Sequence, residues 1–247
     1  MTTAAHPNIL LNGWTAVPLD ACQLFDGQPY MIKPTSLRTK DIKFPSDDAV
    51  VNRVLAYARE RLPSKTLNHS MRVYYYASTI LRQQFPSLAP TLSLSTLAIT
   101  SLLHDIGTTD DNTAATRMSF EFYGGVQAMH VLKEFGADQD QADAACEAII
   151  RHQDLGTLGS ITFLGQLIQL ATIYDNVSEH PYLRDMECMI HAETREDVIA
   201  AFPRTGWLDC FAKTLRREVG LKPWSHTTHI PDFEDHVRGN KLMRQYE

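Results

Sequence analysis

The stretch LAITSLLHDIG, residues 97–107, places a histidine and an aspartate at the end of an otherwise apolar segment. The apolar part has the pattern of a buried helix, and Gly107 then interrupts it. Burying an imidazole or a carboxylate without a partner costs on the order of several kcal/mol. His104 and Asp105 therefore need a partner in the interior, and a helix cap, an ion pair and a metal ion are the candidates.

The overall composition limits the class of protein. The chain has 247 residues, of which 44% are hydrophobic and 21% charged, as in ordinary soluble globular proteins. Its net charge of −6 argues against a nucleic-acid partner or an anionic membrane partner. No apolar stretch reaches the roughly 18 residues of a membrane helix, and no basic region followed by an apolar one opens the chain. We expect a cytoplasmic protein and leave open whether it forms a homo-oligomer.

The cysteines are scattered along the chain and show no Cys-x-x-Cys spacing. They are Cys22, Cys146, Cys188 and Cys210. This pattern favours buried thiols in a reducing compartment over a disulfide framework or a zinc knuckle.

A helical period begins at Ser46, which is placed as a helix N-cap. Residues 1–45 instead carry Gly, Pro and Asn at short intervals, which indicates an irregular arm packed on the body. We predict an all-α fold with this arm and one helical catalytic domain over residues 46–247. After the helix that starts at Ser46, further helices are expected at about 65–85, 93–105, 119–135, 138–152, 163–178, 195–202 and 206–219, the last stopped by Gly220.

Three more of these helices carry a histidine or an aspartate on an apolar face. His69 shares a face with Val73, and His152 shares one with Ile149. Asp175 continues the apolar stripe of FLGQLIQLATIYDN. A single buried histidine is commonly a hydrogen-bonded core residue. Four converging helices would each need a separate partner, whereas one shared divalent cation would satisfy all of them.

The order His69, His104-Asp105, Asp175 resembles the HD superfamily of metal-dependent hydrolases, which carries H…HD…D on a helical bundle. The resemblance implies an HD-domain bundle with these four residues as metal ligands. Six segments together are similar to the cyanamide hydratases, fungal enzymes within that superfamily, and the similarity covers nearly the whole chain from about residue 46. The segments are NHSMRV (68–73), LLHDIGTTDDN (102–112), MSFEFYGG (118–125), EAIIRHQDLG (147–156), DNV (175–177) and KPWSHTT (222–228).

Two departures from the superfamily pattern bear on the metal and the substrate. Many phosphohydrolase members have a lysine after HDIG, where this chain has Thr108, and many two-metal members have a His-Glu pair where this chain has Phe120-Glu121. Both differences favour one metal ion and a small neutral substrate. Zn(II) is our first choice, and Fe(II) and Mn(II) also suit imidazole and carboxylate ligands.

The resemblance therefore implies a cyanamide hydratase, a hydro-lyase that adds a metal-bound hydroxide to the nitrile of cyanamide and yields urea by way of isourea. Neither a redox cofactor nor a nucleotide is needed. We expect His152 and Thr172 to bind substrate or transfer protons. The alternatives are that His152 caps the C-terminus of its helix and that the Thr172 hydroxyl bonds the backbone carbonyl four residues earlier in its helix.

Two other functions use the same residues. The first is an HD-type nucleotidase or phosphodiesterase, in which Arg72 and Arg117 would contact phosphate. The second is a degenerate HD domain retained as a binding module, which the intact ligand positions disfavour. Among the remaining polar residues, Arg72 and Arg151 are expected to pair with carboxylates. Glu121 is expected in an ion pair or at a helix N-terminus, and His226 in a structural loop or a lid.

Overall fold

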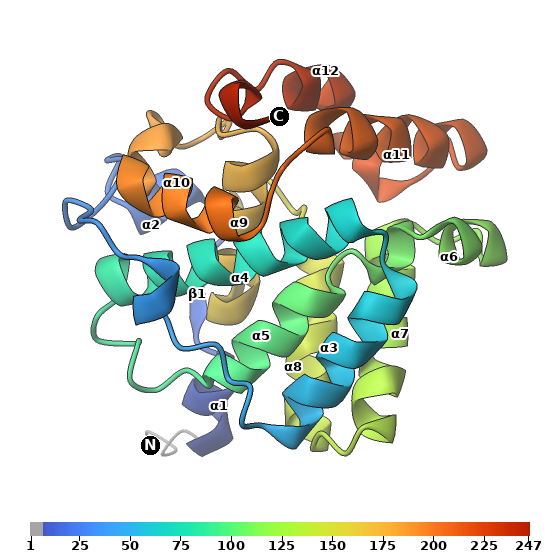
Figure 1. Ribbon diagram of the computed structural model, residues 1–247, viewed down its shortest axis with the longest axis horizontal. Coiled ribbons are helices and arrows are strands. Elements are labelled where there is room, and N and C mark those ends of the chain that lie inside the picture. The colour runs from blue at the N-terminus through green and yellow to red at the C-terminus, as the bar shows by residue number, and fades with distance from the viewer. Residues whose placement is uncertain (1–6) are drawn as a thin grey trace.

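The computed structural model describes residues 7–247 and is built almost entirely of helices, which confirms the all-α prediction (Figure 1). The longer helices are α3 (Ala49–Arg61), α4 (Ser64–Gln84), α5 (Leu94–Leu103), α7 (Phe120–Glu134), α8 (Gln139–Arg151), α9 (Phe163–Asn176), α10 (Ala192–Ala201) and α11 (Trp207–Leu221). The short α-helices are α1 (Pro7–Leu11), α2 (Ala21–Leu24), α6 (Asp110–Ala115) and α12 (Phe233–Arg238). The 3₁₀ helices are η1 (Thr39–Asp41), η2 (Ile106–Thr108), η3 (Met186–Met189), η4 (His226–His229) and η5 (Arg244–Tyr246).

The N-terminal segment is more regular than its composition predicts. Besides α1, α2 and η1 it contains a strand, β1 (Ala16–Pro18), which pairs in antiparallel fashion with β2 (Ser160–Thr162) just before α9. This pairing joins the segment to the central part of the fold. Residues 1–6 of the predicted arm lie outside the described residues, and the boundary at residue 45 stays a prediction.

Two helix boundaries differ from the sequence-based expectation. The cap of α3 is Asp48 and not Ser46, because the Asp48 carboxylate accepts hydrogen bonds from the N–H groups of Val50 and Val51, at 2.8 and 3.2 Å. The predicted stop at Gly220 is also wrong, since α11 runs through it to Leu221. The burial of the preceding turns of α11 outweighs the low helix propensity of one glycine near its end.

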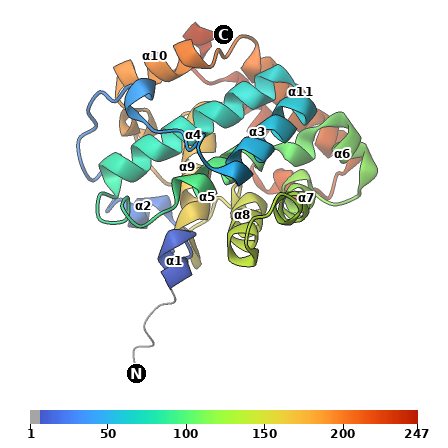
Figure 2. The same ribbon diagram turned by 60° about the horizontal axis from the view of Figure 1, so that its bottom comes forward.

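Helices α4 and α9 form the centre of the molecule. Every residue of α9 is buried, and α4 packs against it and against α5 (Figure 1). Helix α10 lies over α4 on one side, as the turned view shows (Figure 2), and α7 and α8 pack closely on each other. Helices α11 and α12 share a second, smaller hydrophobic cluster that contains Trp207, Phe211 and Phe233. Helix α11 also packs against α4.

The prediction of buried cysteines is wrong. Cys22 and Cys188 are exposed, and Cys146 and Cys210 are half-buried, although all four are free thiols as expected. Within residues 7–247, no helix combines the length and the hydropathy that a membrane crossing requires.

Candidate metal centre

The turn after α5 brings His104 and Asp105 to the same point. Helix α5 ends at Leu103, His104 is its C-cap, and η2 follows directly after Asp105. The start of α7 lies against this turn so closely that a Cβ added at Gly107 would stand 2.0 Å from the carbonyl oxygen of Phe120. Glycine at this position is therefore a packing requirement of the turn.

His69 of α4, His104 and Asp105 converge in the interior. Their ligand atoms all lie within 4.8 Å of one another, and the three side chains are at most 2% exposed. The two Nε2 atoms are 3.2 Å apart, and Asp105 Oδ2 lies 3.3 Å from Nε2 of His104 and 3.7 Å from Nε2 of His69. The structure thus brings together three of the four predicted ligands.

The hydrogen bonds of the two imidazoles determine where their protons lie. Nδ1 of His69 is 2.6 Å from Oδ2 of Asp175, and Nδ1 of His104 is 2.8 Å from the carbonyl oxygen of Ser101. Because both partners are acceptors, each Nδ1 carries the proton, and each neutral ring presents the lone pair of Nε2 to the centre. Asp105 Oδ2 is buried and has no hydrogen-bond partner there. Three acceptors face one another, an arrangement that a cation between them would stabilise.

The pKa shifts at the centre reflect burial and the mutual influence of the three groups. Burial opposes the ionised form of each group. Burial lowers the pKa of His69 to about 4. Asp105 nevertheless has its pKa lowered below its ordinary range, chiefly by the neighbouring His104 imidazole, and Asp105 in turn raises the pKa of His104.

The structure does not bring Asp175 into this cluster. Its carboxylate lies behind His69, where it accepts the hydrogen bond from Nδ1 and faces two buried guanidinium groups. Arg72 reaches Asp175 Oδ2 at 2.9 Å through Nη2, and Arg204 reaches Oδ1 at 2.5 Å through Nη1. These two arginines hold the pKa of Asp175 well below its usual range, although burial works in the opposite direction. Asp175 is therefore ionised and its position is fixed from three sides.

Arg204 was not singled out from the sequence. It follows Pro203 in the loop between α10 and α11, a place with no periodic pattern to reveal its burial. Its Nη1 contacts Asp175, and its Nε lies 3.3 Å from Oε1 of Glu247. The guanidinium group of Arg72 also has several partners, since besides Asp175 it donates to the carbonyl oxygens of Phe202 and Pro203. The expectation that Arg72 pairs with a carboxylate is confirmed.

Aromatic residues of α11 cover His69 from the side opposite the core. The Trp207 ring stacks on the His69 ring with centroids 4.4 Å apart and planes 16° apart, and Phe211 stacks on Trp207 at 5.4 Å. The Trp207 indole donates to Asn176 Oδ1 at 2.8 Å, which fixes the ring to α9. This cover excludes water from the imidazole and accounts for the complete burial of His69.

His152 and Thr172, predicted to bind substrate or transfer protons, are both buried. His152 is the C-cap of α8, and its ring contacts the His104 ring with centroids 5.3 Å apart. Its Nδ1 donates to the carbonyl oxygen of Ile149 at 2.6 Å, which leaves Nε2 as an acceptor. Thr172 lies one turn before Asp175 on α9, and its hydroxyl donates to the carbonyl oxygen of Gln169 at 2.9 Å. The alternative role of His152 as a helix cap is thus also present, whereas the Thr172 hydroxyl bonds the carbonyl three residues earlier and not the expected one four residues earlier.

Comparison with known proteins identifies the family. The chain is 44% identical over 196 residues to cyanamide hydratase DDI2 of Saccharomyces cerevisiae, a match that covers 79% of this chain and 84% of the yeast protein. Cyanamide hydratase DDI3 of the same yeast matches with the same identity and coverage. The chain belongs to the cyanamide hydratase family. No family model matches it, and membership of the wider HD superfamily stays a prediction.

In this member of the cyanamide hydratase family, further polar residues surround His152. Glu121 is completely buried at the start of α7, and its Oε1 lies 2.7 Å from Nδ1 of His226, so the expected ion pair is present. Arg151 contacts the carboxylate of Asp154 at 2.7 Å through Nε, which confirms its expected role. His226 belongs to η4, a 3₁₀ turn that lies against the start of α7.

Proposed function

We propose that this protein hydrates cyanamide to urea with one divalent metal ion, held by Nε2 of His69, Nε2 of His104 and a carboxylate oxygen of Asp105. The observation that carries the proposal is the 44% identity, over 79% of the chain, to two yeast proteins named cyanamide hydratase. The three facing acceptors support the metal ion, and the ligand order supports an HD-type catalytic domain over residues 46–247.

Two imidazoles and one carboxylate suit catalytic zinc sites, which keep an open position, and also suit non-haem Fe(II) sites. Zn(II) remains our first choice. When bound, such an ion would act as a Lewis acid and lower the pKa of water toward neutrality. Asp175 fits the role of the carboxylate that orients a ligand histidine from behind, because it holds the proton on Nδ1 and leaves Nε2 free to ligate.

The remaining residues of the centre suit the needs of the substrate. Hydration forms a bond between a water oxygen and the nitrile carbon and moves one proton from that water to the nitrile nitrogen. The product of this step is isourea, which tautomerises to urea. His152, with Nε2 free, is the group that accepts the proton and returns it. The Thr172 hydroxyl donates its proton to the carbonyl oxygen of Gln169, so its oxygen is free to accept a hydrogen bond from the substrate amino group.

The environment of the centre disfavours a phosphate ester as substrate. Arg72, which a nucleotidase would use on phosphate, is buried and committed to Asp175 and to two backbone carbonyls. Trp207 and Phe211 cover His69 with apolar surface. A neutral molecule of three heavy atoms needs neither a cationic pocket nor a wide one.

The test is to incubate the metal-loaded protein with cyanamide and, separately, with nucleoside monophosphates, and to measure urea and phosphate. We expect urea alone, and none from the His104→Ala variant prepared in parallel. Phosphate without urea would establish the nucleotidase alternative. If the metal-loaded protein forms neither urea nor phosphate, the binding-module alternative is supported.

A further inference from the structure

A second group of charged side chains lies next to His152 and has no part in the metal centre. Glu121 is completely buried, and within residues 7–247 the only hydrogen bond of its side chain joins Oε1 to His226 Nδ1 at 2.7 Å. Its other oxygen, Oε2, has no hydrogen-bond partner among the residues that the structure describes. A buried carboxylate needs a cationic partner, and His226 is the group in position to supply it.

His226 bridges two carboxylates. While Nδ1 faces Glu121, Nε2 lies 3.3 Å from Oδ1 of Asp154. Since both nitrogens face acceptors, the ring satisfies them together only when both nitrogens carry protons, that is, as the imidazolium. The hydrogen bond to Glu121 raises the pKa of His226 above its ordinary value of about 6.5, against the opposing effect of burial. The side chain of His226 is 23% exposed, so protons from solvent reach it.

Both carboxylates belong to segments that lie next to His152. Asp154 lies two residues after His152. Arg151 donates to Oδ2 of Asp154 at 2.7 Å, and Gln169 donates to the Asp154 carbonyl oxygen at 2.9 Å. Phe120, the residue before Glu121, packs its ring on the His152 ring with centroids 5.8 Å apart. His226 therefore connects the loop that follows His152 to the turn of α7 that covers it.

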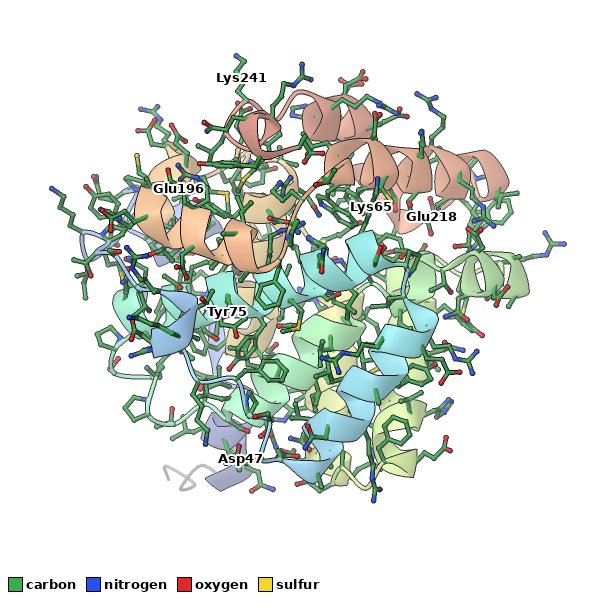
Figure 3. All side chains as sticks on the ribbon, viewed as in Figure 1. Asp47, Lys65, Tyr75, Glu196, Glu218 and Lys241 are labelled. Carbon is green, nitrogen blue, oxygen red and sulfur yellow. The ribbon has the colours of Figure 1, made fainter. Side chains whose placement is uncertain are left out.

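Other charged groups fix η4 onto α7 and face His226. Glu218 of α11, labelled in Figure 3 where α11 faces the start of α7, accepts hydrogen bonds from the Phe120 N–H and the Thr227 hydroxyl, both at 2.6 Å. Lys222 of the same helix donates to the carbonyl oxygen of Met118 at 2.7 Å. His229 stacks on His226 with ring centroids 4.1 Å apart. Glu218 acts with Glu121 and Asp154 to keep His226 protonated, and burial acts against them.

We propose that Glu121, His226 and Asp154 form an ionic clamp that positions His152 for proton transfer, and that the clamp is closed only while His226 is protonated. The proposal rests on the proposed function, since it assigns positioning residues for that reaction. As pH rises through the raised pKa of His226, one ring nitrogen loses its proton and its lone pair faces a carboxylate. The link through His226 between α7 and the loop after His152 is then lost, so turnover has an upper pH limit set by His226.

The experiment combines activity profiles with a direct titration of His226. Zinc-loaded wild type, Glu121→Gln and His226→Ala are compared for metal content and for the pH dependence of kcat and KM, and the His226 pKa is measured by NMR. Glu121→Gln keeps the size of the side chain, whereas His226→Ala strands a buried charge and is the variant at greater risk of misfolding. Glu134→Gln, the same change at the exposed far end of α7, is the control.

We expect Glu121→Gln to lower the His226 pKa and to move the alkaline limb of kcat to lower pH by the same amount. His226→Ala should lower kcat about 10–100-fold at unchanged metal content, with KM much less affected, because misplacement of a catalytic group by about 1 Å costs on this scale. The Glu134→Gln control should match wild type in kcat and in the alkaline limb.

An unchanged His226 pKa in Glu121→Gln, an alkaline limb that does not follow that pKa, or a wild-type kcat in His226→Ala would each overturn the clamp. Loss of metal in Glu121→Gln would overturn it too, because the clamp residues would then serve the metal centre. Absence of urea from wild type would refute the proposed function and not the clamp. The NMR titration alone then decides whether Glu121 holds His226 protonated.

Discussion

Replacing Asp175 by asparagine separates the role seen in the structure from the one that the ligand order implies. Asparagine keeps the size of the side chain and removes its charge. Its amide oxygen, in the place of Oδ1, accepts from Nη1 of Arg204 and Nε of Arg72, since both are donors. Its NH₂ group, in the place of Oδ2, then faces Nδ1 of His69 and also Nη2 of Arg72. Nδ1 of His69 becomes an acceptor, and the proton of His69 moves to Nε2, where it points into the acceptor cluster. His69 must then move this proton back to Nδ1 before it can ligate a metal, and the free energy of that change weakens metal binding.

The cost in stability follows from the two arginines left behind. Removing one partner of a buried ion pair typically costs 3–5 kcal/mol. Arg72 keeps its bonds to Phe202 and Pro203, and Arg204 keeps Glu247 within 3.3 Å, so we expect the lower end, about 3 kcal/mol. For a chain of this size that corresponds to a fall in Tm of roughly 6–12 °C. Loss of the outer partner of a ligand histidine should weaken metal binding about 10–100-fold.

The assay is thermal unfolding of the metal-free protein together with metal titration of the folded protein, for wild type, Asp175→Asn and Asp197→Asn. Asp197 on α10 makes the same class of hydrogen bond, to Thr39, outside the metal centre, and the variant at this position should bind metal as wild type does. Metal affinity within twofold of wild type in Asp175→Asn would refute the positioning role. A complete failure to bind metal at saturating concentrations would instead restore Asp175 as a direct ligand.

Three further predictions concern the centre itself. His69→Ala, His104→Ala and Asp105→Ala should each lose both metal and urea formation, because a three-ligand site has no spare donor; near-normal metal content by elemental analysis would remove that residue from the ligand set. A chelator should abolish urea formation, and Zn(II) or Fe(II) should restore it, whereas activity in demonstrably metal-free protein would end the Lewis-acid mechanism. His152→Ala should keep its metal and lose about 10²–10⁴-fold in kcat, the usual worth of general acid–base help, and Thr172→Val should lose less, since only one hydrogen bond is removed. A His152→Ala variant purified without metal would make His152 a ligand, and one with full activity would leave it as a helix cap only.

The helices that bear on function were predictable because their patterns are local. Amphipathic periodicity located α4, α5, α8 and α9 to within a few residues, and it showed that His69 and His104 lie on buried faces. Short elements were not predictable in this way. The strand β1 owes its existence to β2, far along the chain, and a three-residue segment carries no period of its own.

Spacing along the chain could not distinguish a ligand from the partner of a ligand. His69 and Asp175 were both expected to face the interior, and both do. Which of them reaches the centre depends on where α9 stands against α4, a relation between helices far apart in sequence. Arg204 adds to this, because it lies in a loop and its burial beside Asp175 follows from the path of the chain between α10 and α11.

The amino-acid sequence by itself determined the all-α class, the helices that carry the polar residues, and the His104-Asp105 pair as the point where a buried helix needs a partner. These depend on periodicity and on the cost of burying polar groups, which act over one or two helical turns. The tertiary structure decided that Asp175 lies behind His69 and that Trp207 covers His69. It also decided that Glu121 contacts His226, which is 105 residues away along the chain. Each of these depends on how whole helices pack, since only packing brings distant side chains within hydrogen-bonding distance.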